Sequence, residues 1–498
     1  MWKPPVPDYA EIFNEQNPWH ALGTVPDSLV KPQARSFSDC LWRNLMAPAI
    51  DRYHLIIGPR RVGKTVAMYQ TVRQLINSGV SPSKLWWLHL AHPVLMRHDL
   101  GSLIRAILAS SGPIPEQPLY LFLDEITYAR DWDTWLKVFY DERHPIRLVG
   151  TSSATAALSQ GRVESGIGRW TEHYLSPCLY PEYLNLRRLT YPRLDAASLL
   201  AGIVQATEKV NGDPRRDREL RRYTFVGGFP ELLMQQSGAA VEPTLFNDEE
   251  DLNSVILHSQ GVLRSDAVQK TVYMDIPQVF GVTEPLNLER LLYMLAGQIG
   301  GIVSFANLAT SLGLSAKTLE KYSAYLERSY LTFLIPNYAP REETVQRRGR
   351  KSYFVDAAVR NAALQRGILP LRDPAEEGLL MENVAAAHLH ALAQQENSRL
   401  YYWRDGQDEV DFIFEDTDGP LAIEIGRSGS HSRRGIAALT AKYPKFQGRA
   451  FLVSLTASPL APQNAPDGVG RISFEAFLLA VGQRAEGALR NRMNCAIP

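Results

Sequence analysis

GPRRVGKT, residues 58–65, follows the apolar run YHLII of residues 53–57 and precedes the amphipathic stretch VAMYQTVRQLI of residues 66–76. A strand, a glycine-bounded loop and a helix in this order are the context in which G-x-x-x-x-G-K-[ST] binds phosphate. Glycines are needed because the backbone N–H groups must converge on the phosphates at angles that a side chain would obstruct. We therefore expect the loop and the positive end of the following helix to bind a nucleoside triphosphate.

Within this loop, Lys64 is expected to reach the β- and γ-phosphates, and the Thr65 hydroxyl is expected to hold Mg²⁺. A chance match in a glycine-rich loop is the alternative, which the flanking strand and helix patterns disfavour. ATP and Mg²⁺ are therefore the predicted ligands. The expected phosphate-binding residues are Gly58, Pro59, Arg60, Arg61, Val62, Gly63, Lys64, Thr65 and Val66.

Apolar runs alternate with helical patterns from residue 53 to about residue 186, and the runs include residues 84–90, 119–123 and 146–149. Continuous apolar runs predict strands that are buried on both faces, so we expect an α/β fold with a parallel sheet covered by helices. Aromatic residues on the predicted helix 131–140 are interpreted as part of the core of this sheet.

Two of these strands end in polar residues. Asp124 is expected to order Mg²⁺ through its water shell, and Glu125 to polarise the attacking water. An Asp-Glu pair after a strand also commonly caps a helix, and the preceding phosphate loop favours the catalytic interpretation. Thr151, with Ser152 as the second candidate, could sense the γ-phosphate or hold the lytic water.

A cation further along the chain could neutralise transition-state charge on the nucleotide of a neighbouring subunit. Arg169, in a Gly-Arg turn, is the first candidate and Arg162 is its rival. Either arginine could instead form an ion pair with a surface acid.

Composition limits the number of domains, the kinds of site and the class of protein. The chain has 498 residues, of which 45% are hydrophobic, enough for two to four domains with ordinary cores. Lys+Arg and Asp+Glu number 53 each, so any nucleic-acid contact must come from a local basic surface. The three cysteines lack C-x-x-C spacing, which argues against disulfides and zinc. No signal-peptide pattern or bilayer-length apolar run occurs, so we expect a soluble, cytoplasmic protein.

Residues 285–356 carry a different pattern. Helices over 286–298, 305–312 and 316–330, followed by strands over 331–336 and 352–356, predict a winged helix. The loop between the strands is basic, and it is expected either to contact nucleic-acid phosphates or to be a solvated hairpin tip. The predicted nucleic-acid-binding residues are Arg341, Arg347, Arg348, Arg350 and Lys351 of this loop, with Lys317 and Lys321 of the preceding helix.

The order of motifs GPRRVGKT, LFLDEI with DWDTWLK, VGTSSA, GIGRW, VGGFPE, LATSLGLSAKTLEKYSAYLE, GLLMENVAAAHL, YYWRDGQDEVDF and AIEI resembles the prokaryotic AAA-type ATP-binding proteins with a C-terminal domain of unknown function. This resemblance, over residues 53–455, implies ring-like homo-oligomers with an arginine supplied in trans by Arg169. It also implies an AAA+ nucleotide-binding core (51–186), a helical lid and linker (187–284), a winged helix (285–356) and a domain similar to PD-(D/E)xK nucleases (357–498). The proline-rich residues 1–50 are expected to form an N-terminal arm.

In the last part, Glu382, Asp411 and Glu424 match the carboxylates of that nuclease fold and could bind Mg²⁺. The lysine expected two residues beyond the last acid is Gly426 here. Arg427 points to the opposite face of its strand and, being permanently protonated, is a poor base. We therefore expect a degenerate nuclease-like site, in a nucleic-acid platform or a protein-docking domain.

These features predict an oligomeric, Mg²⁺-dependent AAA+ ATPase that acts on nucleic acid, such as duplex or branched DNA. The alternative prediction is an ATP-gated signalling or scaffold protein that binds a protein partner through its C-terminal domain.

Overall fold

The computed structural model describes residues 9–31, 33–48, 51–111, 118–153, 168–234, 249–428 and 432–495. Its contacts divide the chain into two compact units, each described separately below. Unit 1 contains residues 1–59, 63–175 and 490–498, and unit 2 contains residues 60–62 and 176–489. The five-part division expected from the sequence stays a prediction.

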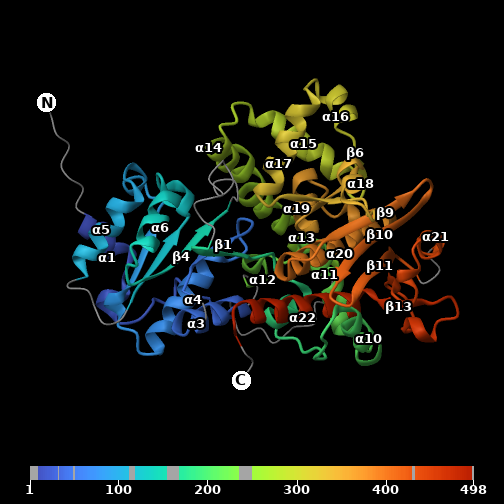
Figure 1. Ribbon diagram of the computed structural model, residues 1–498, viewed down its shortest axis with the longest axis horizontal. Coiled ribbons are helices and arrows are strands. Elements are labelled where there is room, and N and C mark those ends of the chain that lie inside the picture. Colours follow the sequence, from blue (N-terminus) through green and yellow to red (C-terminus); the bar gives the residue numbers. More distant parts are fainter. Residues whose placement is uncertain are drawn as a thin grey trace. The chain divides into compact units, whose positions relative to one another are not determined.

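Unit 1 is built on a parallel sheet of five strands in the order β2-β3-β4-β1-β5. Figure 1 shows α3 and α4 on one side of this sheet and α6 on the other. Together with the α/β region of unit 2, this parallel sheet confirms the predicted fold class. The strands are β1 Tyr53–Ile57, β2 Leu85–His89, β3 Leu119–Asp124, β4 Ile146–Ser152 and β5 Trp170–Tyr174. The helices over the sheet are α4 Lys64–Asn77, α5 Leu100–Ser110 and α6 Trp132–Asp141.

The N-terminal residues cover the β2 edge of this sheet with two helices, α1 Tyr9–Gln16 and α2 Trp19–Leu22, while a third helix, α3 Ser36–Met46, packs on α4. The side chain of Asn17 donates to the carbonyl of Trp87 at 3.0 Å and accepts from its N–H at 2.6 Å, as a neighbouring strand would. The indole of Trp19, fully buried, donates to the carbonyl of Leu85 at 2.8 Å. Because an uncovered edge strand exposes unpaired backbone groups, this segment completes unit 1.

Unit 2 begins with helices and continues with a small antiparallel sheet in the order β6-β8-β7. The first helices are α9 Tyr180–Leu186, α10 Leu199–Lys209, α11 Pro214–Val226, α12 Pro230–Met234, α13 Glu249–Leu263 and α14 Ile276–Phe280, with π-helical turns η4 Arg264–Gln269 and η5 Thr271–Asp275. The elements that follow are α15 Pro285–Gly297, β6 Ile302–Val303, α16 Phe305–Leu312, α17 Ala316–Arg328, β7 Thr332–Pro336, α18 Glu342–Arg347 and β8 Arg350–Phe354. This order matches the elements expected between residues 285 and 356, with the added strand β6 and the short helix α18.

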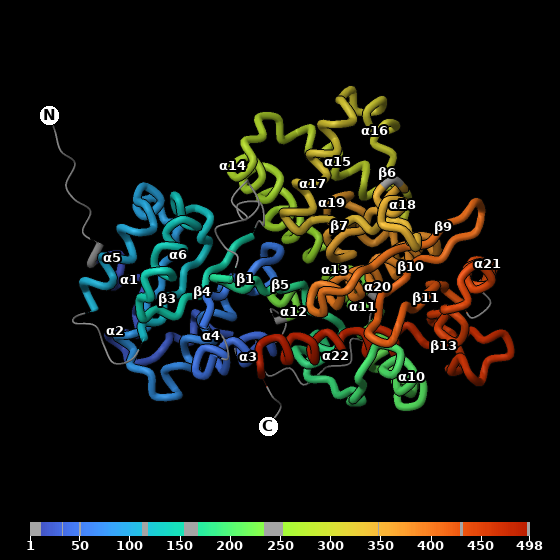
Figure 2. The backbone as a smooth tube through the Cα atoms, in the orientation of Figure 1, coloured from blue at the N-terminus to red at the C-terminus, as the bar shows by residue number. Residues whose placement is uncertain are grey.

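The remainder of unit 2 is a mixed sheet in the order β13-β12-β11-β10-β9, whose labelled strands can be followed in Figure 2. β9, β10 and β11 pair antiparallel, whereas β11, β12 and β13 pair parallel. The strands are β9 Leu400–Asp405, β10 Asp408–Asp416, β11 Gly419–Gly426, β12 Ala450–Ser454 and β13 Val469–Ser473. The helices are α19 Ala357–Leu364, α20 Pro374–Glu396, α21 Arg434–Lys442 and α22 Phe474–Arg492.

The long helix α20 packs on this sheet, and its residues Leu380, Ala385 and Leu389 are fully buried. Among the residues described, no helix combines the length and the apolar character that crossing a membrane requires.

Candidate nucleotide-binding site

The phosphate loop turns at glycines whose positions exclude a side chain. Gly58 has φ +151°, and a Cβ atom added there would lie 2.2 Å from the carbonyl oxygen of Leu175. Gly63 has φ +89° and caps α4, which begins at Lys64. The first N–H groups of a helix have no partner within the helix, so the start of α4 offers donors and a positive dipole end to an anion.

Lys64 is buried inside this loop with 6% of its surface exposed. Its ammonium donates to the carbonyl oxygens of Gly58 and Pro59, at 2.8 Å each. The charge expected to contact phosphates is therefore fixed by the backbone of the same loop.

Asp124, at the end of β3, accepts hydrogen bonds from two threonines on neighbouring elements. Thr65 Oγ1 at the start of α4 donates to Asp124 Oδ1 at 3.1 Å, and Thr151 Oγ1 in β4 donates to the same oxygen at 2.6 Å. This geometry follows from the parallel sheet, because the carboxyl ends of its strands lie at one edge. Two threonines from separate motifs thus converge on the carboxylate of a third motif.

Glu125 follows Asp124 in the left-handed region, with φ +53°, which is uncommon for a residue other than glycine. Its backbone N–H donates to Thr151 Oγ1 at 2.9 Å, and its Oε2 accepts from Ser153 Oγ at 3.1 Å. Thr151 therefore connects the Asp124 carboxylate to the backbone of Glu125. The sequence did not single out Ser153, and Ser152, the second candidate for the γ-phosphate contact, is buried in β4.

His89, at the end of β2, is a further residue that the sequence analysis missed. It pairs in register with Asp124, and its Nδ1 lies 3.3 Å from Asp124 Oδ2. The hydrogen bond to Asp124 raises the pKa of His89, against the smaller lowering effect of burial. Its place at the end of an apolar strand next to β3 was the signal that could have identified it.

The residues present fit a nucleotide with Mg²⁺. Hydroxyl and carboxylate oxygens, as in Thr65 and Asp124, are the ligands that Mg²⁺ takes, and Mg²⁺ at such sites keeps waters and substrate phosphates as its other ligands. No group of three or more His, Cys, Asp or Glu side chains in the described part of the chain is placed to hold a metal ion by itself. A site with one carboxylate and one hydroxyl is consistent with that finding.

The two arginines of the loop have carboxylate partners within unit 2. Arg60 Nε donates to Asp275 Oδ2 at 2.5 Å, and Arg61 forms ion pairs with Glu231 and Asp266. Asp266 and Asp275 lie in η4 and η5. π-Helical turns are rare in proteins, and those that occur are often found at functional sites. In this structure the two side chains bind protein carboxylates, while the sequence predicted phosphate contacts.

Arg169, the candidate for action in trans, forms an ion pair with Asp141 of the same unit, with Nε 2.8 Å from Oδ1. Its backbone carbonyl also accepts from the N–H of Tyr53 at 3.0 Å, at the start of β1. The rival Arg162 lies outside the described residues.

The predicted basic surface is smaller than the sequence indicated. Lys317, Lys321 and Arg341 are exposed, whereas Lys351 lies in β8 with 2% of its surface exposed. The expected loop ended at Lys351, but β8 already begins at Arg350, so Lys351 is a buried residue of the strand. Arg348 donates to Asn337 at 3.1 Å and Arg350 to Gln346 at 3.3 Å, and the side chain of Arg347 lies outside the described part.

The nuclease-like carboxylates do come together. The backbone N–H of Ile425 donates to Asp411 Oδ2 at 2.8 Å, and that of Asp411 donates to Glu424 Oε2 at 3.4 Å. Glu382 of α20 accepts from the Tyr353 hydroxyl at 2.6 Å. Gly426, where the nuclease fold has its lysine, is buried at the end of β11.

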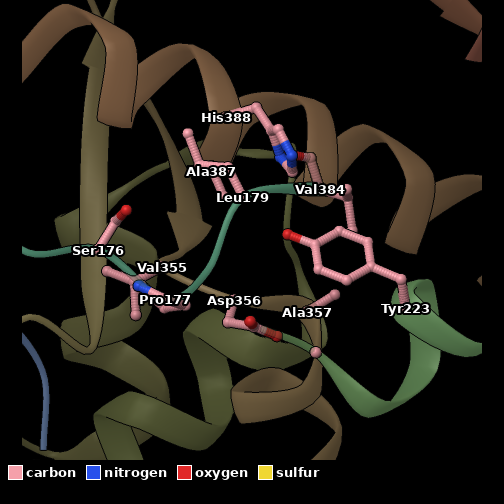
Figure 3. Close-up of a pocket in the computed structure, with 11 residues that line it drawn as sticks. Ser176, Pro177, Leu179, Tyr223, Val355, Asp356, Ala357, Val384, Ala387 and His388 are labelled. Atoms are coloured by element: carbon pink, nitrogen blue, oxygen red, sulfur yellow. The ribbon is translucent and has the colours of Figure 1, made fainter. Parts of the chain in front are cut away.

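A small cavity in unit 2, shown in Figure 3, lies between Asp356, Tyr223 and His388. Its volume of about 10 Å³ is enough for roughly one water. The N–H of Tyr180 donates to His388 Nε2 at 3.0 Å, and Asp356 accepts from the N–H groups of Gly228 and Ala358, at 2.8 Å each. Because these polar groups are already bonded within the fold, we interpret the cavity as a packing feature.

Comparison with protein families identifies three regions. Residues 51–184 match an AAA domain, residues 217–368 match a domain of unknown function (DUF8612), and residues 377–465 match a second domain of unknown function (DUF4143). The chain therefore contains an AAA domain, which includes the phosphate loop, Asp124, Glu125 and Thr151.

The relatives found have no known function. An uncharacterised protein of Methanocaldococcus jannaschii is 23% identical over 394 residues, which cover 77% of each chain. An uncharacterised protein of Haemophilus influenzae is 23% identical over 326 residues, which cover 63% of this chain and 70% of the relative.

Among solved structures, the chain is similar to the ORC2 protein of Aeropyrum pernix, with 13% identity, a TM-score of 0.38, and coverage of 72% of this chain and 96% of that chain. It is also similar to the RuvB Holliday junction branch migration motor of Thermotoga maritima, with 20% identity, a TM-score of 0.25, and coverage of 62% and 91%. Because these scores are low, the functional argument rests on the AAA match and on the geometry of the site.

Proposed function

We propose that this chain is an Mg²⁺-dependent ATPase whose site lies at the phosphate loop between β1 and α4. The observation that carries the proposal is the meeting of Thr65, Thr151 and Asp124 beside a buried Lys64. Thr65, Thr151 and Asp124 come from three different elements, and all four residues have the chemistry needed to bind triphosphate with its metal or to organise the attacking water.

Each side chain would then have a distinct task. Mg²⁺, held by Thr65 and by Asp124 through water, would supply positive charge to the phosphate oxygens. Lys64 and the N–H groups at the start of α4 would bind and orient the phosphates. Glu125 would accept the proton of the attacking water, with its carboxylate oriented by Ser153.

The proposal includes assembly into a ring-like homo-oligomer with Arg169 acting on the nucleotide of the neighbouring subunit. Its basis is the resemblance described above and the position of Arg169, half-buried, in the turn before β5. Action in trans would require Arg169 to exchange Asp141 for the phosphates of that nucleotide.

We further propose that unit 2 binds nucleic acid through exposed cations of the 285–354 segment. Lys317 and Lys321 lie on α17 and Arg341 precedes α18, and all three are exposed. Phosphate contacts of this kind give affinity without sequence preference and make it depend on salt.

The second candidate is an ATP-gated scaffold that binds a protein. It is favoured by the loss of Lys351 from the basic surface and by a cleft of about 450 Å³ in unit 2, lined by apolar and charged side chains that include Leu455, Arg221 and Glu377. Turnover measured with single-stranded, duplex and branched DNA distinguishes the two, because only the first function predicts stimulation by DNA.

Purified variants test the ATPase itself. Lys64→Ala should weaken ATP binding and stop turnover, whereas Glu125→Gln should keep binding and lose hydrolysis, because only the group acting on water is changed. Glu142→Gln is the matched control, because Glu142 is an exposed acid of unit 1 paired with His144. Hydrolysis by Glu125→Gln at the parent rate would show that Glu125 is not the base.

A further inference from the structure

A buried lysine lies among the nuclease-like carboxylates of unit 2. Lys351 belongs to β8, the strand that ends the 285–354 segment, and it pairs in register with Ile335 of β7. Side chains alternate along a strand, so Lys351 and Tyr353 share one face. That face meets α20, where Tyr353 donates to Glu382.

The ammonium of Lys351 is surrounded by acids. Its Nζ lies 2.5 Å from Glu409 Oε1, 3.8 Å from Glu382 Oε1 and 3.8 Å from Asp411 Oδ1. Its side chain is 3% exposed, whereas those of Glu382, Glu409 and Asp411 are 19%, 32% and 13% exposed. The ammonium therefore lies beneath the carboxylates, away from solvent.

The protonation states agree with this geometry. Burial opposes a charged ammonium, but Asp411, Glu382 and Glu409 outweigh burial and raise the pKa of Lys351. Burial, followed by repulsion from Asp411, raises the pKa of Glu382 to about 7, while Lys351 and the Tyr353 hydroxyl act in the opposite direction. A charged lysine thus compensates acids that would otherwise repel one another.

We propose that the Lys351 ammonium is the permanent cation of the cluster formed by Glu382, Glu409 and Asp411, and that the cluster fastens β8 to the C-terminal sheet instead of binding a divalent metal. In charge and position the ammonium takes the place of a metal ion. This inference is independent of nucleotide binding.

The lysine of a metal-dependent nuclease must reach the attacked phosphate or its water, and Lys351 is closed off from both by the acids above it. Gly300 adds to the enclosure, because a Cβ atom there would lie 2.7 Å from Glu382 Oε1. The carboxylates within the described residues also do not form a group placed to hold a metal.

Other contacts join the 285–354 segment to the C-terminal sheet and its helix α20. The side chain of Asn383 in α20 donates to the carbonyl of Phe354 and accepts from its N–H, at 2.9 Å each. The hydroxyl of Tyr402 in β9 donates to the carbonyl of Gly349 at 2.8 Å, and the N–H of Tyr338 donates to the carbonyl of Tyr402 at 2.6 Å. Several hydrogen bonds besides the cluster therefore join the 285–354 segment to the C-terminal sheet.

Thermal unfolding and Mn²⁺ binding of the full chain test the proposal, in an Asp124→Asn background that removes the carboxylate proposed to hold the metal of the nucleotide site. The parent should bind no Mn²⁺ at the cluster. Lys351→Met should unfold several degrees lower, roughly 5–10 °C, because it leaves buried acids without a cation. Mn²⁺ should restore part of that loss, and Asp411→Asn in addition should abolish the restoration.

Glu409→Gln gives a milder test should Lys351→Met fail to fold. It should lower the unfolding midpoint clearly more than Glu415→Gln, a matched change of an exposed acid on the same strand. Equal midpoints for these two variants would overturn the proposal. Mn²⁺ binding by the parent that Asp411→Asn removes, or Mn²⁺-dependent cleavage of labelled DNA, would also overturn it. If Lys351→Met were destabilised and Mn²⁺ did not restore its stability, the claim that the Lys351 ammonium takes the place of a metal ion would be refuted.

Discussion

Thr151→Val tests how far the nucleotide site depends on one hydroxyl. Thr151 is fully buried, donates to Asp124 at 2.6 Å and accepts from the N–H of Glu125 at 2.9 Å. A hydrogen bond to a charged group contributes about 1.5–3 kcal/mol, and an unsatisfied buried donor costs about 1–3 kcal/mol. Since burial of the added methyl group contributes about 0.8 kcal/mol in the opposite direction, we expect a net loss of stability of about 2–5 kcal/mol.

For a unit of this size, that loss lowers the melting temperature by about 4–20 °C. Turnover should fall by roughly tenfold to a hundredfold, less than the ~10²–10⁴ expected for losing a general base, because Glu125 remains but loses its orientation. Thermal unfolding, and ATPase assays at saturating ATP well below the transition, measure the two effects separately.

The matched control is Thr71→Val, a fully buried threonine of α4 in the same unit. The Thr71 hydroxyl donates to the carbonyl of Ala67 at 2.8 Å, and this carbonyl also accepts a backbone hydrogen bond within α4. Removal of the hydroxyl should therefore cost about 1 kcal/mol of stability or less. Equal destabilisation by the two variants, or unchanged turnover in Thr151→Val, would refute the linking role of Thr151.

Arg169→Ala mixed with Lys64→Ala should regain activity, because one interface then combines an intact loop with an intact arginine; no recovery in stable mixed assemblies would contradict action in trans. Gly58→Ala should abolish ATP binding, because the added Cβ would lie 2.2 Å from a carbonyl oxygen, whereas Gly79→Ala, also at positive φ but with nothing within 4 Å, should retain it. Burial raises the pKa of Asp356 to about 6, so the folded state holds its proton more tightly than the unfolded state. Stability should therefore fall by about 3 kcal/mol as pH rises from about 4 to 6, a slope that Asp356→Asn should lack in unfolding measurements.

The parts of the site that the sequence predicted are those with local patterns. The sequences of β1, β2, β3 and β4 are apolar runs because these strands are buried on both faces, and the polar residues at the ends of β3 and β4 were recognised by their position, whereas His89 at the end of β2 was not. β5, WTEHY, was missed because it is the edge strand and carries Glu172 and His173, which read as a loop.

Contacts between residues that are far apart in the chain left no pattern in the local sequence. Lys351 was assigned to an exposed loop because it ends the run RRGRK, and only the strand register and the carboxylates of distant elements bury it. The ion pair of Arg169 with Asp141 and the contact of Gly58 with Leu175 likewise depend on tertiary structure. Lys317 and Lys321, whose surroundings are set by their own helix, are exposed, while their predicted contact with nucleic acid stays a prediction.

Unit 1 is assembled from both ends of the chain. Asn44 of α3 donates to the carbonyl of Met493 at 2.9 Å, and Arg492 donates to the carbonyl of Glu172 in β5 at 3.0 Å. During synthesis on a ribosome, the nucleotide-binding part therefore lacks these supports of α3 and β5 until residue 493 has emerged. A nascent or truncated chain would carry the phosphate loop on a sheet that lacks these contacts. We therefore expect the nucleotide site to reach its final structure only after residue 493 has been translated.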